Sequence, residues 1–226
     1  MSKPRLILSW SSGKDCAFAL HALRREGRYD VVGLATTFNS AFDRVAMHAV
    51  RRELVEAQAA ATGLPLWRID LPWPCSNEDY ERIMTGFVAE ARAAGVTAMA
   101  FGDLFLEDVR AYREKNLAGT GMEPVFPLWG RDTSLLAREM IAAGLEARVT
   151  CVDPRQLDPS FAGRAFDAAF LDDLPGGVDP CGERGEFHSF CHAGPMFDRP
   201  LAIRLGHTVT RDGFVFTDLL AADVER

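Results

Sequence analysis

Short apolar runs alternate with helix-like segments through the first hundred residues, and this alternation strongly limits the fold. Residues 5–10, 30–36, 64–71 and 96–101 read as buried strands. Between them, residues 15–26, 44–62 and 76–94 carry apolar side chains at helical spacing. Gly27 and Gly63 are expected to end the first two helices, and Ser76 to cap the start of the third. Repeated strand–helix units predict an α/β fold, with a parallel sheet and helices on both faces.

After residue 104, strand-like and helix-like segments alternate less regularly. We expect a charged helix at 107–117, a strand at 124–128, a helix at 133–143 and a strand at 145–152. The remaining chain is rich in proline and glycine, with short strands expected at 186–191, 201–205 and 213–217. These features predict two domains, residues 1–122 and a smaller α+β domain of residues 123–226.

Charge and cysteine usage narrow the class of protein. The formal net charge is −7 and no basic run is present, so nucleic acid is an unlikely partner. No apolar run is long enough to span a membrane, and the first residues do not resemble a signal peptide. The five cysteines are odd in number and lack C-x-x-C spacing. We therefore expect a cytoplasmic protein without a membrane partner.

The loop S-S-G-K-D-C, residues 11–16, joins the first strand to the first helix. A Walker loop would need glycine where Leu8 stands and serine or threonine at Asp15, and a dinucleotide loop would need more glycines. A phosphate seat remains, in which Gly13 and the helix N-terminus approach an anion. Ser11 and Ser12 would add hydroxyl donors, and Lys14 a mobile positive charge. Asp15 would cap the loop or hold Mg²⁺.

Three further polar blocks lie near the expected strand ends. R-V-A-M-H-A-V-R-R-E, residues 44–53, contains His48 and Arg51 on a predicted helix near the ligand-binding edge of the sheet. F-G-D-L-F-L-E-D-V-R-A-Y-R, residues 101–113, follows the fourth strand. Its candidate ligand-contacting residues are Gly102, Asp103, Glu107, Arg110 and Arg113.

The third block, residues 179–197, contains Glu183, Glu186 and His188. In a strand beginning at Glu186, that carboxylate and the imidazole of His188 share one face. This face suits general acid–base chemistry or substrate clamping.

The loop resembles the pyrophosphate loop, S-G-G-x-D-S, of the adenine nucleotide alpha hydrolase-like superfamily. Ser12 and Cys16 depart from that pattern. Together with the three blocks and their order, the loop resembles the diphthine–ammonia ligase family and its bacterial relatives, over nearly the whole chain. G-E-R-G-E-F-H-S-F, from residue 182, is similar to that family's G-E-x-G-E-Y/F-E/H-T/S-F block.

This resemblance implies a Rossmann-like, HUP-type first domain that binds ATP and Mg²⁺. Residues 11–16, including Cys16, would surround the phosphates, and Thr36, Thr37 and Gly102 would lie by the adenine or ribose. Glu183, Glu186 and His188 would face an acceptor that carries a carboxylate. ATP would be cleaved to AMP and pyrophosphate through an acyl adenylate, and ammonia would then form an amide. The acceptor stays open, and so does a homodimer.

Three other functions stay open. An ATP-dependent tRNA-modifying enzyme that transfers sulfur uses the same kind of loop, but would favour a basic surface and reactive cysteines. An adenine-nucleotide sensor would bind without pyrophosphate release, and the changes at Ser12 and Cys16 leave room for it. In a plain α/β domain, the same blocks would only form core and turns.

Overall fold

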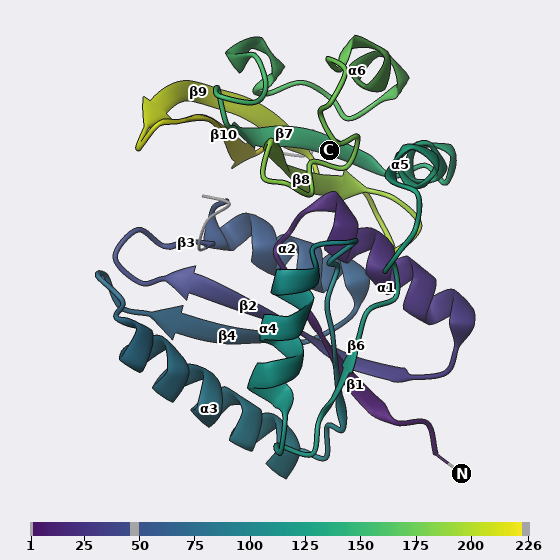
Figure 1. Cartoon of the computed structure of the whole chain (residues 1–226), viewed down its shortest axis with the longest axis vertical. Helices are drawn as coiled ribbons and strands as arrows, with labels where there is room; N and C mark the ends of the chain where they lie inside the picture. The colour runs from purple at the N-terminus through teal and green to yellow at the C-terminus, as the bar shows by residue number, and fades with distance from the viewer. Residues whose placement is uncertain (1, 46–49, 223–226) are drawn as a thin grey trace.

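The first domain is built on a mostly parallel sheet, as the alternation predicts (Figure 1). The computed structural model describes residues 2–45 and 50–222. The sheet strands are β1 (Arg5–Ser9), β2 (Asp30–Asn39), β3 (Arg44–Val45), β4 (Leu66–Leu71), β5 (Ala98–Ala100) and β6 (Glu123–Val125). The helices are α1 (Lys14–Glu26), α2 (Arg52–Thr62), α3 (Asn77–Ala93) and α4 (Glu107–Leu117).

The predicted helix ends are confirmed. Gly27 and Gly63 follow α1 and α2 with φ of 67° and 70°, a left-handed conformation that glycine adopts without strain. The Ser76 side chain accepts a hydrogen bond from the Asp79 amide at the start of α3.

The order of the strands creates a crevice beside β1. β2 pairs parallel to β1 on one side and β5 pairs parallel to it on the other, so the direction of winding reverses at β1. Outward from these neighbours lie β4, next to β2, and β6, next to β5. In open α/β sheets, ligands bind at such a reversal, beyond the carboxyl ends of the strands. Here those ends are Ser9 and Ala100.

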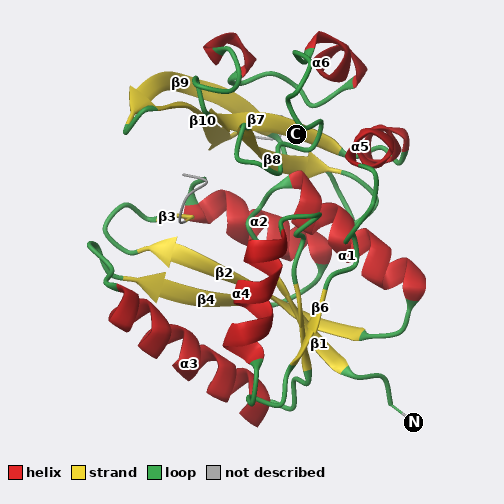
Figure 2. Cartoon of the chain, viewed as in Figure 1, coloured by secondary structure: helices red, strands yellow, loops and turns green. Residues whose placement is uncertain are grey.

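A second, antiparallel sheet covers this carboxyl edge (Figure 2). Its order is β8-β7-β10-β9, with α5 and α6 beside it. The strands are β7 (Glu146–Val152), β8 (Phe187–Ala193), β9 (Ile203–Arg211) and β10 (Phe214–Ala221), and the helices are α5 (Thr133–Ala142) and α6 (Ala168–Asp173). The smaller α+β domain is thereby confirmed.

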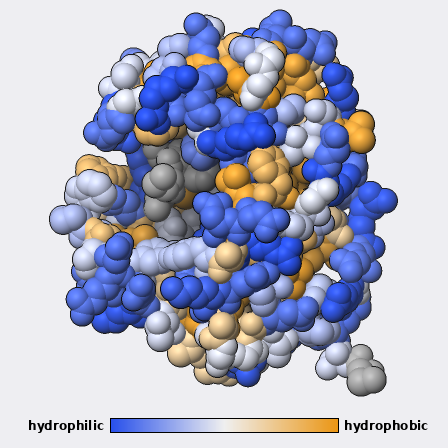
Figure 3. Space-filling view, viewed as in Figure 1, coloured by the Kyte–Doolittle hydropathy of each residue, from blue (hydrophilic) through white to orange (hydrophobic). Residues whose placement is uncertain are grey.

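Alternate side chains of β1 reach two hydrophobic cores. Leu6 and Leu8 belong to a core that includes α1, α2 and the inner strands of the second sheet. Ile7 points to a separate core under α3 and α4. Because the first core runs continuously through both domains, it fixes them against each other. Polar groups cover most of the face shown in Figure 3.

The strand pairings bear on two predicted boundaries. Residues 44–62 do not form one helix, because Arg44 and Val45 pair with the end of β2 and α2 begins only at Arg52. The domain boundary after residue 122 would separate β6 from its own sheet, in which Glu123 pairs with Ala98. In the described parts of the chain, no helix has the length and apolarity to cross a membrane.

Candidate active site

The loop between β1 and α1 contains a serine in a conformation that favours glycine. Ser12 has a φ of 72°. Its carbonyl accepts hydrogen bonds from the Cys191 amide at 2.9 Å and from the Gln58 side chain at 3.0 Å. Its hydroxyl is buried and has no hydrogen-bond partner among the described residues. Contacts to α2 and β8 therefore hold the strained backbone in place.

The loop is compressed between β8 and the end of β5. A Cβ at Gly13 would lie 3.3 Å from the Ser189 carbonyl oxygen, and one at Gly102 would lie 2.9 Å from the Cys16 amide nitrogen. The Ser189 hydroxyl also accepts a hydrogen bond from the Lys14 amide at 3.2 Å. A side chain at Gly102 would therefore clash with backbone, and one at Gly13 would be tightly packed.

Lys14 is not the mobile charge expected from the sequence, because its side chain is only 2 % exposed. Its ammonium group lies 2.9 Å from a carboxylate oxygen of Asp15 and donates to the Cys181 carbonyl. It also lies 5.4 and 5.1 Å from the ring centres of Phe166 and Phe187. Contacts with the second domain thus fix the position of the Lys14 ammonium group.

The loop, the end of β5 and the second domain enclose a cavity of about 220 Å³, which we call the loop cavity. Most predicted site residues meet in its wall: Ser11, Gly13, Lys14, Asp15, Cys16, Gly102, Asp103, Arg113, Glu183 and His188. It lies at the N-terminus of α1, where backbone amides and the helix dipole favour an anion.

Burial sets the protonation of the carboxyl groups around this cavity. The pKa of Glu183 is raised to about 7, chiefly by burial and also by the charges of Asp15 and Asp103, while the hydrogen bond from the Leu104 amide at 2.7 Å opposes the rise. Burial also raises the pKa of Asp15 and of Asp103, against the opposing effects of Lys14 and Arg113. A carboxyl group with a pKa near 7 can exchange protons at neutral pH.

His188 is neutral at pH 7. Burial first, and the charge of Lys14 second, lower its pKa to about 4. Its imidazole can therefore orient a ligand through hydrogen bonds without adding a fixed positive charge.

A second cavity adjoins the loop cavity at the ends of the central strands. This strand-end cavity, of about 290 Å³, shares Ser9, Ser11, Phe101 and Arg113 with the loop cavity. Thr37 lines it, together with apolar side chains that include Val45, Ile69 and Leu71. The two cavities together provide a polar half and a more apolar half, as a nucleotide requires.

Three predicted site residues lie outside the two cavities. The hydroxyl of Thr36 donates to the Trp10 carbonyl at 2.7 Å inside the core. Arg110 donates to Glu114 at 2.7 Å and stacks on Phe126 and Trp129, and Glu107 is exposed at the start of α4. None of these three lines either cavity.

The prediction that Glu186 faces a ligand beside His188 also needs correction. It is buried before the first residue of β8, and its two carboxylate oxygens accept from the Asp179 and Arg184 amides, both at 2.9 Å. These two amides belong to the turn that carries Glu183, and Glu186 is their hydrogen-bond acceptor. Glu186 therefore holds the turn and does not share a cavity-facing side with His188.

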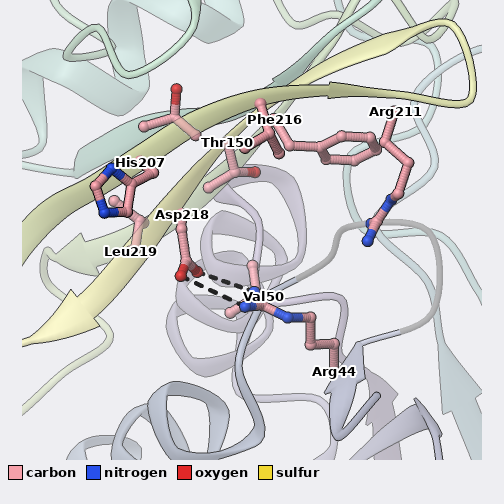
Figure 4. A pocket seen from close by; sticks show the side chains of 10 residues that line it. Arg44, Val50, Thr150, His207, Arg211, Phe216, Asp218 and Leu219 are labelled. Carbon is pink, nitrogen blue, oxygen red and sulfur yellow. Dashed lines mark hydrogen bonds and ion pairs between the residues drawn. The ribbon is translucent and has the colours of Figure 1, made fainter. Parts of the chain in front are cut away.

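Arg51 does not line the loop cavity. It donates to Asp218 on β10, with a shortest distance of 2.6 Å. Arg44 donates to the same carboxylate at 2.9 Å (Figure 4). This arrangement lies beside a separate cavity of about 200 Å³ under β9 and β10. His48 lies outside the described residues.

Gln58 was not predicted to matter, yet it is fully buried beside the loop. Its side chain accepts from the Trp10 indole at 2.8 Å and donates to the carbonyls of Ser12 and Cys191 at 3.0 and 2.6 Å. The sequence carries one sign of this role. Gln58 is polar, yet it stands four positions after Leu54, on the apolar face of the helix.

The fit of the site to a metal rests on Asp15. One of its carboxylate oxygens is buried without a hydrogen-bond partner among the described residues. In the described chain, no three histidine, cysteine or acidic side chains are grouped as a metal cage. One carboxylate oxygen beside a phosphate seat suits Mg²⁺, which is commonly held by one or two carboxylates, phosphates and water.

The buried cysteines do not resemble reactive thiolates. Burial raises the pKa of Cys16 to about 11 and also raises that of Cys151, Cys181 and Cys191. All five cysteines are unpaired. Thiol chemistry at these buried positions is therefore disfavoured.

Comparison with known proteins identifies the family. Residues 4–124 match the diphthamide synthase N-terminal domain, and residues 132–216 match the diphthamide synthase C-terminal domain. A diphthine–ammonia ligase of Danio rerio is 28% identical over 237 residues, which cover 94% of this chain and 91% of that protein. Those of Rattus norvegicus and Homo sapiens are each 24% identical over 229 residues, covering 91% of this chain and 85% of each relative. These matches confirm the family expected from the sequence motifs. The chain belongs to the diphthamide synthase family.

Proposed function

We propose that this chain is an ATP-dependent ligase that forms AMP and pyrophosphate, activates an acceptor carboxylate as an acyl adenylate and amidates it with ammonia. The observation that carries this proposal is the meeting of three features in one cavity. These are the N-terminus of α1, the crevice between β1 and β5, and the side chains of Glu183, a proton acceptor, and of neutral His188. The named activity of the relatives supports the same reaction.

The two adjoining cavities suggest how ATP lies. The β- and γ-phosphates would occupy the loop cavity near residues 11–15, where helix amides and Lys14 favour negative charge. The adenosine would occupy the strand-end cavity near Thr37. The α-phosphate would then lie at the shared wall formed by Ser9, Ser11, Phe101 and Arg113.

This placement assigns a task to each remaining charged group. Arg113, whose Nε lies 3.4 Å from Asp103, would stabilise charge that develops at the α-phosphate. Lys14 and the amides of α1 would hold the leaving pyrophosphate. Glu183, with its pKa near neutrality, would accept a proton from the attacking nitrogen, and His188 would orient the acceptor or ammonia.

We further propose Mg²⁺ as the cofactor, with the free oxygen of Asp15 as its protein ligand. Bound there, Mg²⁺ would neutralise phosphate charge. Cytoplasmic location is part of the proposal, and the unpaired cysteines support it. Diphthine is the acceptor named for the relatives, and for this chain it stays one candidate among carboxylates. A homodimer stays a prediction.

Product analysis tests the reaction. With ATP, Mg²⁺, ammonia and a panel of carboxylates, we expect AMP and pyrophosphate in equal amounts, dependent on the acceptor. Arg113→Met should abolish this turnover. Arg110→Met, on the same helix but outside the two nucleotide cavities, should retain it. ADP and phosphate as products would overturn the proposal, and nucleotide binding without any cleavage would favour a sensor.

A further inference from the structure

A third cavity lies between α3 and α4 and opens toward the proposed nucleotide site. This helix cavity has a volume of about 280 Å³. It shares Tyr80, Met84, Met99, Phe101 and Arg113 with the strand-end cavity. The remainder of its wall, including Val88, Leu117 and Tyr112, belongs to neither nucleotide cavity.

Arg113 connects all three cavities. It and Phe101 line the loop, strand-end and helix cavities alike. The guanidinium lies 5.1 Å from the centre of the Phe101 ring, within the range of a cation–π contact. A group bound by Arg113 from the helix cavity would therefore meet the α-phosphate at the wall shared by the other two cavities.

The lining of the helix cavity selects the chemistry of its ligand. Its half-buried part consists of Met84, Val88 and Tyr80, and Leu117 and Met99 are buried at its base. Glu81 lies at the exposed rim. The cation in its wall is Arg113, whose Nε donates to Asp103 at 3.4 Å. The two terminal nitrogens of the guanidinium remain for a ligand carboxylate, which such groups bind in a planar, two-point geometry. The cavity thus combines an apolar body with a carboxylate-binding end.

We propose that the helix cavity binds the acceptor, a small carboxylic acid with an uncharged apolar or aromatic body, whose carboxylate is held by Arg113 against the α-phosphate of ATP. The proposal rests on the proposed ligase function and deepens it. A carboxylate oxygen would attack the α-phosphorus, the bond to pyrophosphate would break, and an acyl adenylate would form. Ammonia would then replace AMP and release one proton, for which Glu183 is the acceptor.

The size of the cavity also favours a small acceptor. Small-molecule pockets usually measure ~300–1,000 Å³, and the helix cavity lies just below that range. A volume of this size suits a compact acid.

The test uses the whole protein with a saturating non-cleavable ATP analogue and measures binding of 3-phenylpropionate by calorimetry. Val88→Trp should fill the cavity and weaken binding at least tenfold, while affinity for the nucleotide changes less than twofold. The matched control is Ala89→Trp, one position along α3 and exposed outside the cavity. Asn116→Trp, with Lys115→Trp as its control, repeats the comparison from α4 and covers the case in which Val88→Trp does not fold.

Several outcomes would overturn the inference. One is that the wild-type protein does not bind 3-phenylpropionate. Another is that Val88→Trp and Asn116→Trp bind it as tightly as their control variants do. A third is that the acid and the nucleotide compete for binding. Tighter binding of succinate or of γ-butyrobetaine would overturn the stated class, because these acids carry a second charge. Failure of the wild-type protein to bind ATP would instead contradict the proposed function, so the two failures are distinguishable.

Discussion

The side-chain amide of Gln58 donates to the carbonyl of Ser12 at 3.0 Å, and so fixes a serine in the left-handed conformation at the N-terminus of α1. The same amide group donates to the Cys191 carbonyl at 2.6 Å. One buried glutamine therefore joins the loop to β8 of the second domain. The shape of the proposed phosphate seat depends on residues far away in the sequence.

Ser12→Gly should stabilise the protein. Glycine adopts a φ of 72° without the cost of a Cβ, and the change removes a buried hydroxyl that has no partner. Against this, glycine loses more entropy on folding, so we expect a net gain of about 1 kcal/mol in the free energy of unfolding. Urea denaturation checks this, and ATP affinity should be retained. A clear loss of stability would mean that the Ser12 side chain contributes packing that outweighs the strain.

Gln58→Met should weaken both stability and nucleotide binding. The change preserves the length of the side chain but leaves the Trp10 indole and two carbonyls without their buried partner, at a cost of about 2–4 kcal/mol. The KM for ATP should rise more than kcat falls, because the loop loses its fixed shape.

The exposed Glu56 on the same helix provides the control, since Glu56→Met should change stability by less than about 0.5 kcal/mol. Adding Ser12→Gly to Gln58→Met should restore part of the ATP affinity. No restoration would show that Gln58 acts only through general packing.

Lys14→Met should destabilise the protein even without nucleotide. The buried ammonium pairs with Asp15 and donates to the Cys181 carbonyl, so its removal leaves the half-buried Asp15 carboxylate and that carbonyl without this partner, which costs about 1–3 kcal/mol. Adding Asp15→Asn should recover stability but not ATP affinity. Thermal unfolding and ATP titration of both variants separate the two effects. Unchanged stability of Lys14→Met would show that the ammonium is not buried in solution.

Glu183 should make the wild-type protein less stable as the pH rises. Its pKa is raised from the usual 4.5 to about 7, so the folded state binds more protons between these values. The stability from this group is fully present below pH 4.5 and is lost as the pH rises through about 7.

Glu183→Gln removes this titration while Asp15 and Asp103 remain. Relative to wild type, the variant should therefore gain stability as the pH increases from 5 to 8, as measured by urea unfolding at each pH. A constant difference between the two proteins would contradict the raised pKa.

Local patterns predicted the fold well, because strands, helices and caps such as Gly27 and Ser76 depend on neighbouring residues. The loop, Arg113 and Glu183 could also be found, since they stand beside strand ends or in a specific motif. Contacts between segments that lie far apart in the sequence could not be predicted. The burial of Lys14 depends on Phe166, Cys181 and Phe187. The late start of the helix predicted for residues 44–62 depends on the pairing of Arg44 and Val45 with β2. Glu186 alternates correctly with His188 in sequence, yet the turn before β8 takes its carboxylate.

The most direct test of the account is a crystal structure with α,β-methylene-ATP, which cannot be cleaved at the reacting bond. We expect the β- and γ-phosphates at residues 11–15, the α-phosphate beside Arg113 and the adenine in the strand-end cavity near Thr37. Phosphates bound instead beside Arg44 and Arg211, in the cavity under β10, would contradict it.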